Sequence, residues 1–103
     1  MPVAHLTKQT FENLVLEGKA TALVDFWAPW CGPCKMLGPV IETIAGEVPE
    51  GILVAKVNVD EEPELAAKYG VMSIPTVISF KDGDEHRRTV GLLPKDRILE
   101  LLN

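Results

Sequence analysis

Two cysteines stand between a strand-like apolar run and a helical pattern, and this junction constrains the fold more than any other feature of the chain. The apolar run is Ala22–Trp27, and the segment Trp30-Cys31-Gly32-Pro33-Cys34 follows it. From Lys35 to Val48 the apolar residues recur at the three- and four-residue spacing of an amphipathic helix. We therefore predict that both cysteines lie at a strand-to-helix junction, in the first turn of the helix.

The predicted helix start has a chemical consequence for Cys31. If Cys31 is the N-cap, Pro33 falls in the first turn, where its missing N–H group costs little. The sulfur of Cys31 then faces free backbone N–H groups at the positive end of the helix, which favours the thiolate. Cys34, three residues further on, points into the first turn and is expected to be more buried. Cα atoms at this spacing lie roughly 5–5.5 Å apart, within the range that a disulfide accepts.

Three kinds of site can use such a cysteine pair. A structural cross-link is disfavoured, because so short a loop removes little entropy from the unfolded chain. A zinc site would need two further ligands, and the only histidines, His5 and His86, are isolated from each other and from the cysteines; we expect no metal. A reversible redox dithiol is the interpretation we favour, with Cys31 as the nucleophile, Cys34 as the resolving cysteine, and Gly32 and Pro33 between them.

Composition and charge argue against several other classes of function. The chain has 103 residues, 47% of them hydrophobic, and we expect a single domain over residues 1–103 with its own core. The formal net charge is −5 and there is no basic cluster, so nucleic acid and anionic membranes are not expected partners. No apolar run approaches the ~20 residues of a membrane span, and the N-terminus does not resemble a secretory signal. We expect a cytoplasmic protein.

The remaining periodicities predict the element order β-α-β-α-β-α-β-β-α. The predicted strands are Val3–Leu6, Ala20–Trp27, Leu53–Val59, Thr76–Lys81 and Glu85–Val90. Asp82-Gly83 is a strong hairpin signal between the last two strands. Crossovers followed by an antiparallel hairpin predict an α/β fold with a mixed sheet covered by helices on both faces. The cysteine pair then lies at the carboxyl end of a strand, where such sheets usually carry their sites.

The predicted helices begin at Thr7, at Cys31, within Asp60–Pro63 and at Pro94. In the first helix, we expect Phe11, Leu14 and Val15 to form the apolar face. The second is expected to continue through Pro39 with a kink. Asp60, Glu61 and Glu62 are interpreted as acids that favour the positive end of the third helix, not as metal ligands.

Together these segments resemble the thioredoxin family over essentially the whole chain. The matching positions are Trp30–Cys34, Val24–Ala28, Pro39, Lys56, Ile74-Pro75-Thr76 and Gly91. The resemblance implies the thioredoxin fold, a three-layer sandwich in which four helices flank a mixed five-stranded sheet. It also implies a protein-disulfide reductase: a monomeric, general electron donor of the cytosol that acts on disulfide-containing proteins and is re-reduced by thioredoxin reductase. No G-x-G-x-x-G follows a predicted strand, so we expect no nucleotide or flavin cofactor.

Two alternatives remain open from the sequence. The same chemistry could run as a disulfide oxidase or isomerase, although Gly32-Pro33 between the cysteines resembles the reducing branch of the family. A binding module that uses the same groove without redox turnover is the other alternative, and the presence of both cysteines and of Asp25 argues against it.

Asp25 and Lys56 are single charges inside two predicted strands. Because an unpaired buried carboxylate is costly, burial raises the pKa of such a group. The two residues could form a buried ion pair that only keeps both charges satisfied. The resemblance favours a different role, in which Asp25 accepts the proton of Cys34 when that thiol attacks and Lys56 tunes Asp25.

Several further residues are candidates for substrate binding. Trp30, between Pro29 and the helix start, is interpreted as a substrate contact, with a packing aromatic as the alternative, and Trp27 as core support. Gly91 either forms a turn or lets a partner approach closely.

The resemblance adds a cis Ile74–Pro75 bond that faces the cysteines and leaves the backbone of Ile74 free to pair with an extended substrate. It also implies an apolar rim, used by substrates and by the reductase, that contains Val59, Ile74, Val90 and Leu92. Relatives commonly carry a basic residue near Met72, a glycine near Ser73 and a small residue at Leu92, so we expect partner choice to differ.

Overall fold

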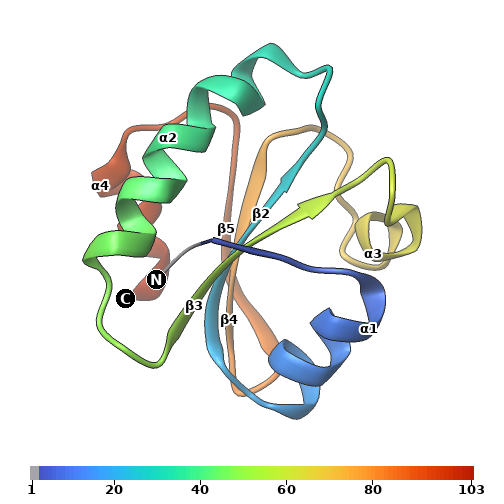
Figure 1. Cartoon of the computed structure of the whole chain (residues 1–103), viewed down its shortest axis with the longest axis vertical. Coiled ribbons are helices and arrows are strands. Elements are labelled where there is room, and N and C mark those ends of the chain that lie inside the picture. Colours follow the sequence, from blue (N-terminus) through green and yellow to red (C-terminus); the bar gives the residue numbers. More distant parts are fainter. Residues whose placement is uncertain (1–2) are drawn as a thin grey trace.

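One mixed β-sheet organises the fold of the computed structural model, which describes residues 3–103 (Figure 1). The strands are β1 (Ala4–His5), β2 (Thr21–Trp27), β3 (Ile52–Asn58), β4 (Thr76–Lys81) and β5 (Asp84–Val90). They lie in the order β1-β3-β2-β4-β5. β3 pairs parallel with β1 and β2, whereas β4 runs antiparallel to β2 and to β5. The predicted mixed sheet, with a parallel part followed by an antiparallel hairpin, is confirmed.

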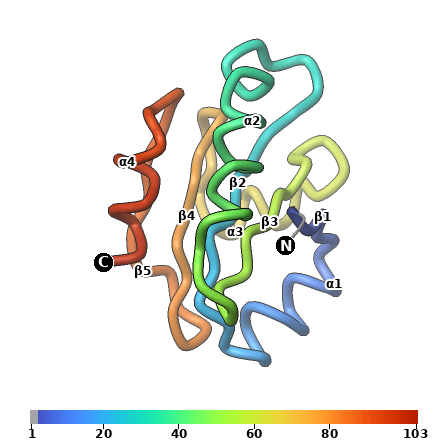
Figure 2. Tube along the Cα trace, turned by 60° about the vertical axis from the view of Figure 1, so that its left-hand side comes forward, coloured from blue at the N-terminus to red at the C-terminus, as the bar shows by residue number. Residues whose placement is uncertain are grey.

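Helices cover both faces of this sheet. They are α1 (Lys8–Phe11), which continues as η1 (Glu12–Glu17), α2 (Gly32–Glu47), α3 (Pro63–Lys68), and α4 (Lys95–Leu99), which continues as η2 (Glu100–Leu102). Figure 1 shows α1 and α3 on one side and α2 and α4 on the other. In the turned view of Figure 2 the C-terminal helix runs beside the β4–β5 hairpin, with which η2 is in contact.

Two apolar cores join the three layers. One lies under α1 and α3 and includes Phe11, Val15, Val24, Phe26, Leu65, Ile78 and Phe80. The other lies under α2 and α4 and includes Leu23, Leu37, Ile41, Ile44, Val54, Val77 and Ile98. Successive side chains of a strand point to opposite faces, so β2 contributes Val24 and Phe26 to the first core and Leu23 to the second. Asp25 therefore lies on the α2 side.

The first helix differs from the prediction in one respect. Thr7 is its N-cap and accepts a hydrogen bond from the N–H of Thr10, as expected of an N-cap threonine. Beyond Phe11 the helix widens into a π-helix, in which the N–H of Gly18 bonds to the carbonyl of Asn13 at 3.0 Å. The expectation that Leu14 faces the core is wrong: its side chain is 46% exposed, because the wider turn rotates it off the buried face.

The helix that carries the cysteines is continuous through Pro39 as far as Glu47, so the predicted continuation is confirmed. The third helix begins at Pro63, and its N-cap residue Glu62 makes no side-chain capping bond. The Glu62 carboxylate instead accepts a hydrogen bond from the backbone N–H of Lys8 at 2.6 Å, and Asp60 bonds to Trp30. The expected place at the positive end of α3 holds for Glu62, its N-cap residue, but the side chains of Asp60 and Glu62 do not cap the helix through hydrogen bonds, because both find donors in other segments.

The hairpin turn is confirmed at Asp82-Gly83. Both residues have positive φ angles, 54° and 85°, as a two-residue hairpin requires. A Cβ atom on Gly83 would lie 3.0 Å from the carbonyl oxygen of Leu16, so the turn also packs closely against the end of η1.

We predict that Gly83→Ala destabilises the fold by about 1–2 kcal/mol, because it places a side chain at a positive φ and against the Leu16 carbonyl. Gly46→Ala is the matched control: Gly46 lies in α2, and an added Cβ would have nothing within 4 Å. Helix propensity alone should make that variant more stable by about 0.5–1 kcal/mol. Urea unfolding of both variants measures the difference, and a Gly83→Ala variant as stable as Gly46→Ala contradicts the description of the turn.

Candidate active site

The carboxyl end of β2 is where the segments predicted for the site converge. In the sheet register Trp27 is the partner of Asn58, Phe26 of Thr76, and Thr76 of Val90. Because β3 is parallel to β2 and β4 is antiparallel to it, the ends of β2, β3 and β5 and the beginning of β4 lie along one edge of the sheet. The chain segments that follow these ends, or precede β4, carry the cysteines, Val59, Ile74-Pro75 and Gly91.

The local structure at the cysteines is the one predicted from their spacing. Cys31 is the N-cap of α2, in an extended conformation, and Pro33 lies in the first turn. The backbone N–H of Cys34 donates a hydrogen bond to Sγ of Cys31 over 3.2 Å. The sulfur of Cys31 therefore occupies the position at which a helix N-terminus binds negative charge.

A disulfide joins Cys31 and Cys34, whose Cα atoms lie 5.2 Å apart. Cys34 is 1% exposed and Cys31 is 6% exposed, which confirms that Cys34 is the more enclosed of the two. Sγ of Cys31 also lies 3.8 Å from the carbonyl oxygen of Ile74, so the more accessible sulfur faces the segment that precedes β4.

The Ile74–Pro75 peptide bond is cis, as the family resemblance implied. Among the hydrogen bonds of residues 3–103, none is donated by the backbone N–H of Ile74. The carbonyl of Pro75 accepts a hydrogen bond from the N–H of Gly91 at 2.8 Å, and Gly91 has a φ of 97°. A Cβ on Gly91 would meet nothing within 4 Å, so the glycine serves the backbone conformation and not a close packing contact within the chain.

Asp25 is a buried carboxyl group without a partner. Its side chain is 1% exposed, and in the part of the chain that the structure describes neither carboxylate oxygen has a hydrogen-bond partner. Burial raises the pKa of Asp25 to about 7, and the nearby positive charge of Lys56 acts in the opposite direction. At neutral pH this group is therefore divided between its acid and its base form.

The ion-pair interpretation of Asp25 and Lys56 is wrong. The two residues are partners in the β2–β3 register, yet within residues 3–103 no ion pair joins them. Nζ of Lys56 lies instead over the indole ring of Trp27, 4.2 Å from its centroid. The ammonium group is stabilised by the face of an aromatic ring, and Asp25 keeps its high proton affinity.

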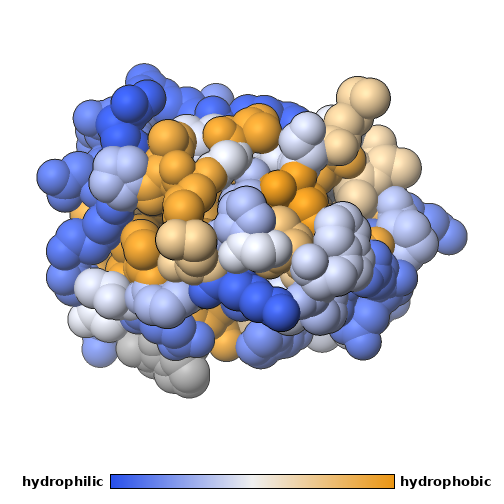
Figure 3. All heavy atoms as spheres, turned by 90° about the horizontal axis from the view of Figure 1, so that it is seen from above, coloured by the Kyte–Doolittle hydropathy of each residue, from blue (hydrophilic) through white to orange (hydrophobic). Residues whose placement is uncertain are grey.

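Apolar side chains surround the dithiol at this end of the molecule. Figure 3 views the end at which β2 leads into α2 and shows patches of apolar side chains on it. The rim residues Trp30, Val90 and Leu92 are 69%, 56% and 41% exposed, and Met72 is 96% exposed. Ile74 and Val59 are half-buried and Pro75 is buried.

Asp60 is the residue of this region that the sequence interpretation missed. Its carboxylate accepts a hydrogen bond from Nε1 of Trp30 at 2.9 Å. Asp60 follows β3, which is the parallel neighbour of β2, so its position at the shared carboxyl edge was the signal that could have placed it near the cysteines.

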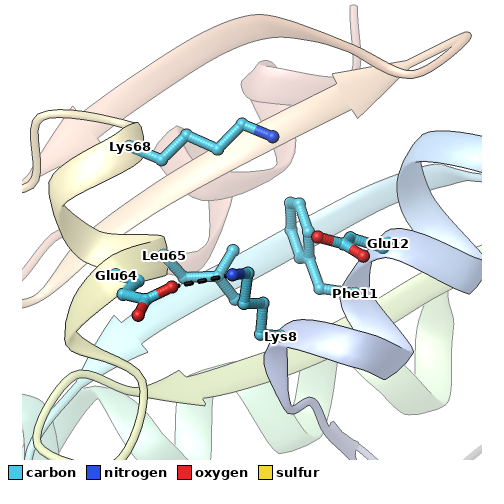
Figure 4. A pocket seen from close by; sticks show the side chains of 6 residues that line it. All are labelled: Lys8, Phe11, Glu12, Glu64, Leu65 and Lys68. Atoms are coloured by element: carbon cyan, nitrogen blue, oxygen red, sulfur yellow. Dashed lines mark hydrogen bonds and ion pairs between the residues drawn. The ribbon is translucent and has the colours of Figure 1, made fainter.

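A separate hollow of about 240 Å³ lies between α1 and α3, on the other side of the sheet from α2 (Figure 4). Phe11 and Leu65 contribute its apolar lining, and Nζ of Lys8 is paired with the Glu64 carboxylate at 2.7 Å. Among residues 3–103, no three His, Cys, Asp or Glu side chains are grouped so that they could hold a metal ion. No helix of that range has the length and apolar character needed to cross a membrane.

Known proteins match this chain along its length. A family model described as Thioredoxin matches residues 2–103. Thioredoxin 1 of Synechococcus elongatus is 47% identical over 100 residues, which are 97% of this chain and 94% of that protein. The thioredoxin of Bacillus subtilis is 47% identical over 103 residues, or 100% of this chain and 97% of that protein. A solved mutant thioredoxin from Halobacterium salinarum NRC-1 gives a TM-score of 0.87 at 38% identity, covering 98% of this chain and 88% of that chain.

The chain belongs to the thioredoxin family. The cysteine pair is accordingly a redox-active disulfide, and the chain is a thiol–disulfide oxidoreductase with protein-disulfide reductase activity. The predicted thioredoxin fold, with a five-stranded mixed sheet and four helices, is confirmed. Membership of the family implies disulfide-containing target proteins and thioredoxin reductase as partners.

The raised pKa of Asp25 predicts a pH-dependent loss of stability. Well below the unfolded pKa of 3.8 the carboxyl is protonated in both the folded and the unfolded chain, and its folded-state pKa of about 7 lies above that value. As the pH rises between these values, the unfolded chain releases the proton first, so folding becomes less favourable. The total effect is about 4 kcal/mol.

Asp25→Asn removes this titration and is the appropriate comparison. As the pH rises from about 4 to about 7, the parent chain should lose stability relative to Asp25→Asn, so the unfolding free energy of the variant minus that of the parent increases. Above about pH 7 this difference should become constant. Urea unfolding of the oxidised proteins across this range measures it. A difference that does not change with pH would mean that Asp25 titrates normally.

Proposed function

We propose that this chain is a monomeric, general electron donor of the cytosol that reduces disulfides in extended segments of other proteins and is itself re-reduced by thioredoxin reductase. The observation that carries the proposal is the position of Sγ of Cys31. It receives the N–H of Cys34 at the start of α2 and lies 3.8 Å from the Ile74 carbonyl at an apolar edge.

The first step is attack by Cys31 on a target disulfide. In the reduced protein the N–H groups at the start of α2 favour the thiolate of Cys31, which displaces one sulfur of the target as a thiolate and forms a mixed disulfide with the other. Gly32 and Pro33 support this step through the backbone. Pro33 is accommodated in the first turn, and Gly32 has no side chain at the exposed helix start.

The second step is resolution by Cys34. The Cys34 thiol attacks Sγ of Cys31, releases the second target sulfur and forms the Cys31–Cys34 disulfide seen in the structure. For this attack the thiol must lose its proton, and we assign Asp25 as the acceptor. It lies on the face of the sheet that α2 covers, and its pKa of about 7 suits proton transfer at neutral pH. Lys56 tunes this carboxyl through its charge.

The target binds along the edge around the dithiol. We propose that an extended segment pairs with the backbone of Ile74, whose N–H is free of partners in residues 3–103, in the manner of an added strand. Trp30, Val59, Pro75, Val90, Gly91 and Leu92 form the apolar surface that contacts it. Met72 and Leu92 enlarge the exposed apolar area beside this surface, so targets and the reductase are expected to present apolar side chains there.

The oxidase and isomerase alternative, and the alternative of a binding module, are less well supported. Gly32-Pro33 is the sequence between the cysteines that resembles the reducing branch, and the relatives from Synechococcus elongatus and Bacillus subtilis are both named thioredoxin.

A relative from Chlamydomonas reinhardtii is named chloroplastic. Fractionation of cells that express the tagged chain tests the proposed compartment.

The two-step mechanism predicts opposite behaviour for the two cysteine variants. Cys34→Ser keeps the nucleophile and loses the resolving thiol, so it should accumulate mixed disulfides with target proteins. Cys31→Ser should neither reduce a disulfide substrate such as insulin nor form adducts. Non-reducing electrophoresis with mass spectrometry of the adducts measures both.

The double variant Cys31→Ser, Cys34→Ser serves as the control for redox-independent binding. If it supports the same biological activity as the parent chain, the binding-module alternative is correct and electron transfer is incidental. Adducts that form on Cys34 in the Cys31→Ser variant as readily as on Cys31 would contradict the assigned roles.

A further inference from the structure

Two residues of β2 lie on the same face of the sheet as Lys56 of β3, and each can attract its ammonium group. Leu23 and Val54 are partners in the β2–β3 register, and both belong to the core under α2. Asp25 and Lys56 are each two residues further along their strands, so they lie on that same face. Trp27, two residues beyond Asp25, shares the face and is the diagonal neighbour of Lys56.

The ammonium group lies with the aromatic neighbour. Nζ of Lys56 is 4.2 Å from the centroid of the Trp27 ring, well within the range of a cation–π contact. In residues 3–103 both carboxylate oxygens of Asp25 remain without a hydrogen-bond partner, and so does the buried Nε1 of Trp27. The indole therefore meets the lysine through its face, and the register alone would equally have allowed a direct ion pair.

Burial explains why the two neighbours are not equivalent. Asp25 is 1% exposed, whereas Trp27 and Lys56 are both half-buried. A direct ion pair would bring the ammonium group from this half-buried setting to a fully buried carboxylate. Its attraction to the carboxylate would have to offset the further loss of hydration.

The position of the ammonium group matters because it is the charge that faces Asp25 from the neighbouring strand. From β4 the register partner of Asp25 is Val77, which does not titrate, and on this side of the sheet α2 contributes the buried Cys34 and α4 the apolar Ile98. A direct ion pair would hold the carboxylate ionised and make it a weaker base.

We infer that Trp27 is a positioning residue: its indole ring holds the ammonium group of Lys56 away from Asp25, so that the carboxylate can take up the proton of Cys34. This inference rests on the role proposed above for Asp25. It extends the site to a residue that the sequence interpretation treated as core support.

A double-mutant cycle tests the inference. The titration of Asp25 is followed by the ¹³C chemical shift of its carboxyl carbon in the oxidised protein, for the parent chain, Trp27→Leu, Lys56→Met and the combined variant. Loss of the ring releases the ammonium group to the carboxylate, so Trp27→Leu should lower the proton affinity of Asp25 roughly threefold or more when Lys56 is present. In the Lys56→Met background the same substitution should leave it unchanged.

Two further variants keep the test decisive. Trp27→Phe retains an aromatic face that binds cations more weakly, so it should give a smaller shift in the same direction, and it carries the test if Trp27→Leu does not fold. Trp30→Leu is the matched control, because the indole N–H of Trp30 donates to Asp60, and within residues 3–103 the aromatic ring under the Lys56 ammonium group is that of Trp27.

Three results would overturn the inference. A rise in the proton affinity of Asp25 would mean that the ring holds the ammonium group near the carboxyl. Equal shifts with and without Lys56 would mean that Trp27 acts only by excluding water. No shift in Trp27→Leu or Trp27→Phe would mean that the ring does not position the lysine.

Kinetics separate this inference from the proposed function. If Asp25 accepts the proton of Cys34, the pH profile of the resolution step in Trp27→Leu should move to lower pH together with the titration of Asp25, while Cys31 still attacks. A shifted titration with an unshifted resolution profile would leave the positioning role of Trp27 in place and overturn the catalytic role of Asp25.

Discussion

The backbone N–H of Cys34 points at the sulfur of Cys31 from 3.2 Å, and the other features of the site depend on this contact. It exists because β2 ends at Trp27, the short connection turns the chain, and α2 begins directly after Cys31. Pro33 is tolerated because the N–H that it lacks would have no partner in the helix. A disulfide can therefore open or close at a helix N-terminus that favours negative charge on one of its two sulfurs.

Burial has the opposite electrostatic effect on the neighbouring carboxyl. The helix N-terminus stabilises negative charge at Cys31, whereas the apolar surroundings of Asp25 disfavour it and raise its pKa to about 7. The two effects therefore serve the two cysteines differently. The helix N-terminus favours the thiolate of Cys31, which attacks the target, and Asp25 is available as a base for the thiol of Cys34. Because the cysteines and Asp25 share one small region, their protonation is expected to be coupled.

The parts of this account that could be predicted from the sequence depend on local rules. The N-cap at Cys31, the hairpin at Asp82-Gly83 and the element order follow from residue types at short spacing. The cis bond at Ile74–Pro75 came only from the family resemblance. Leu14 was misplaced because a π-helix changes the period on which the prediction relied. The contacts of Asp60 with Trp30 and of Lys56 with Trp27 join different strands and loops, and local spacing cannot choose among such partners.

The pH dependence of alkylation of the reduced protein tests the central claim most directly. Iodoacetamide is added at a series of pH values, and the modified cysteine is identified by peptide mass. The account predicts that Cys31 reacts first at every pH. As the pH is raised, its alkylation rate should reach a plateau before about pH 8. A free cysteine is half-ionised at about pH 8.5, so its rate still increases with pH in that range. A Cys31 rate that follows that of a free cysteine peptide, or earlier modification of Cys34, would contradict it.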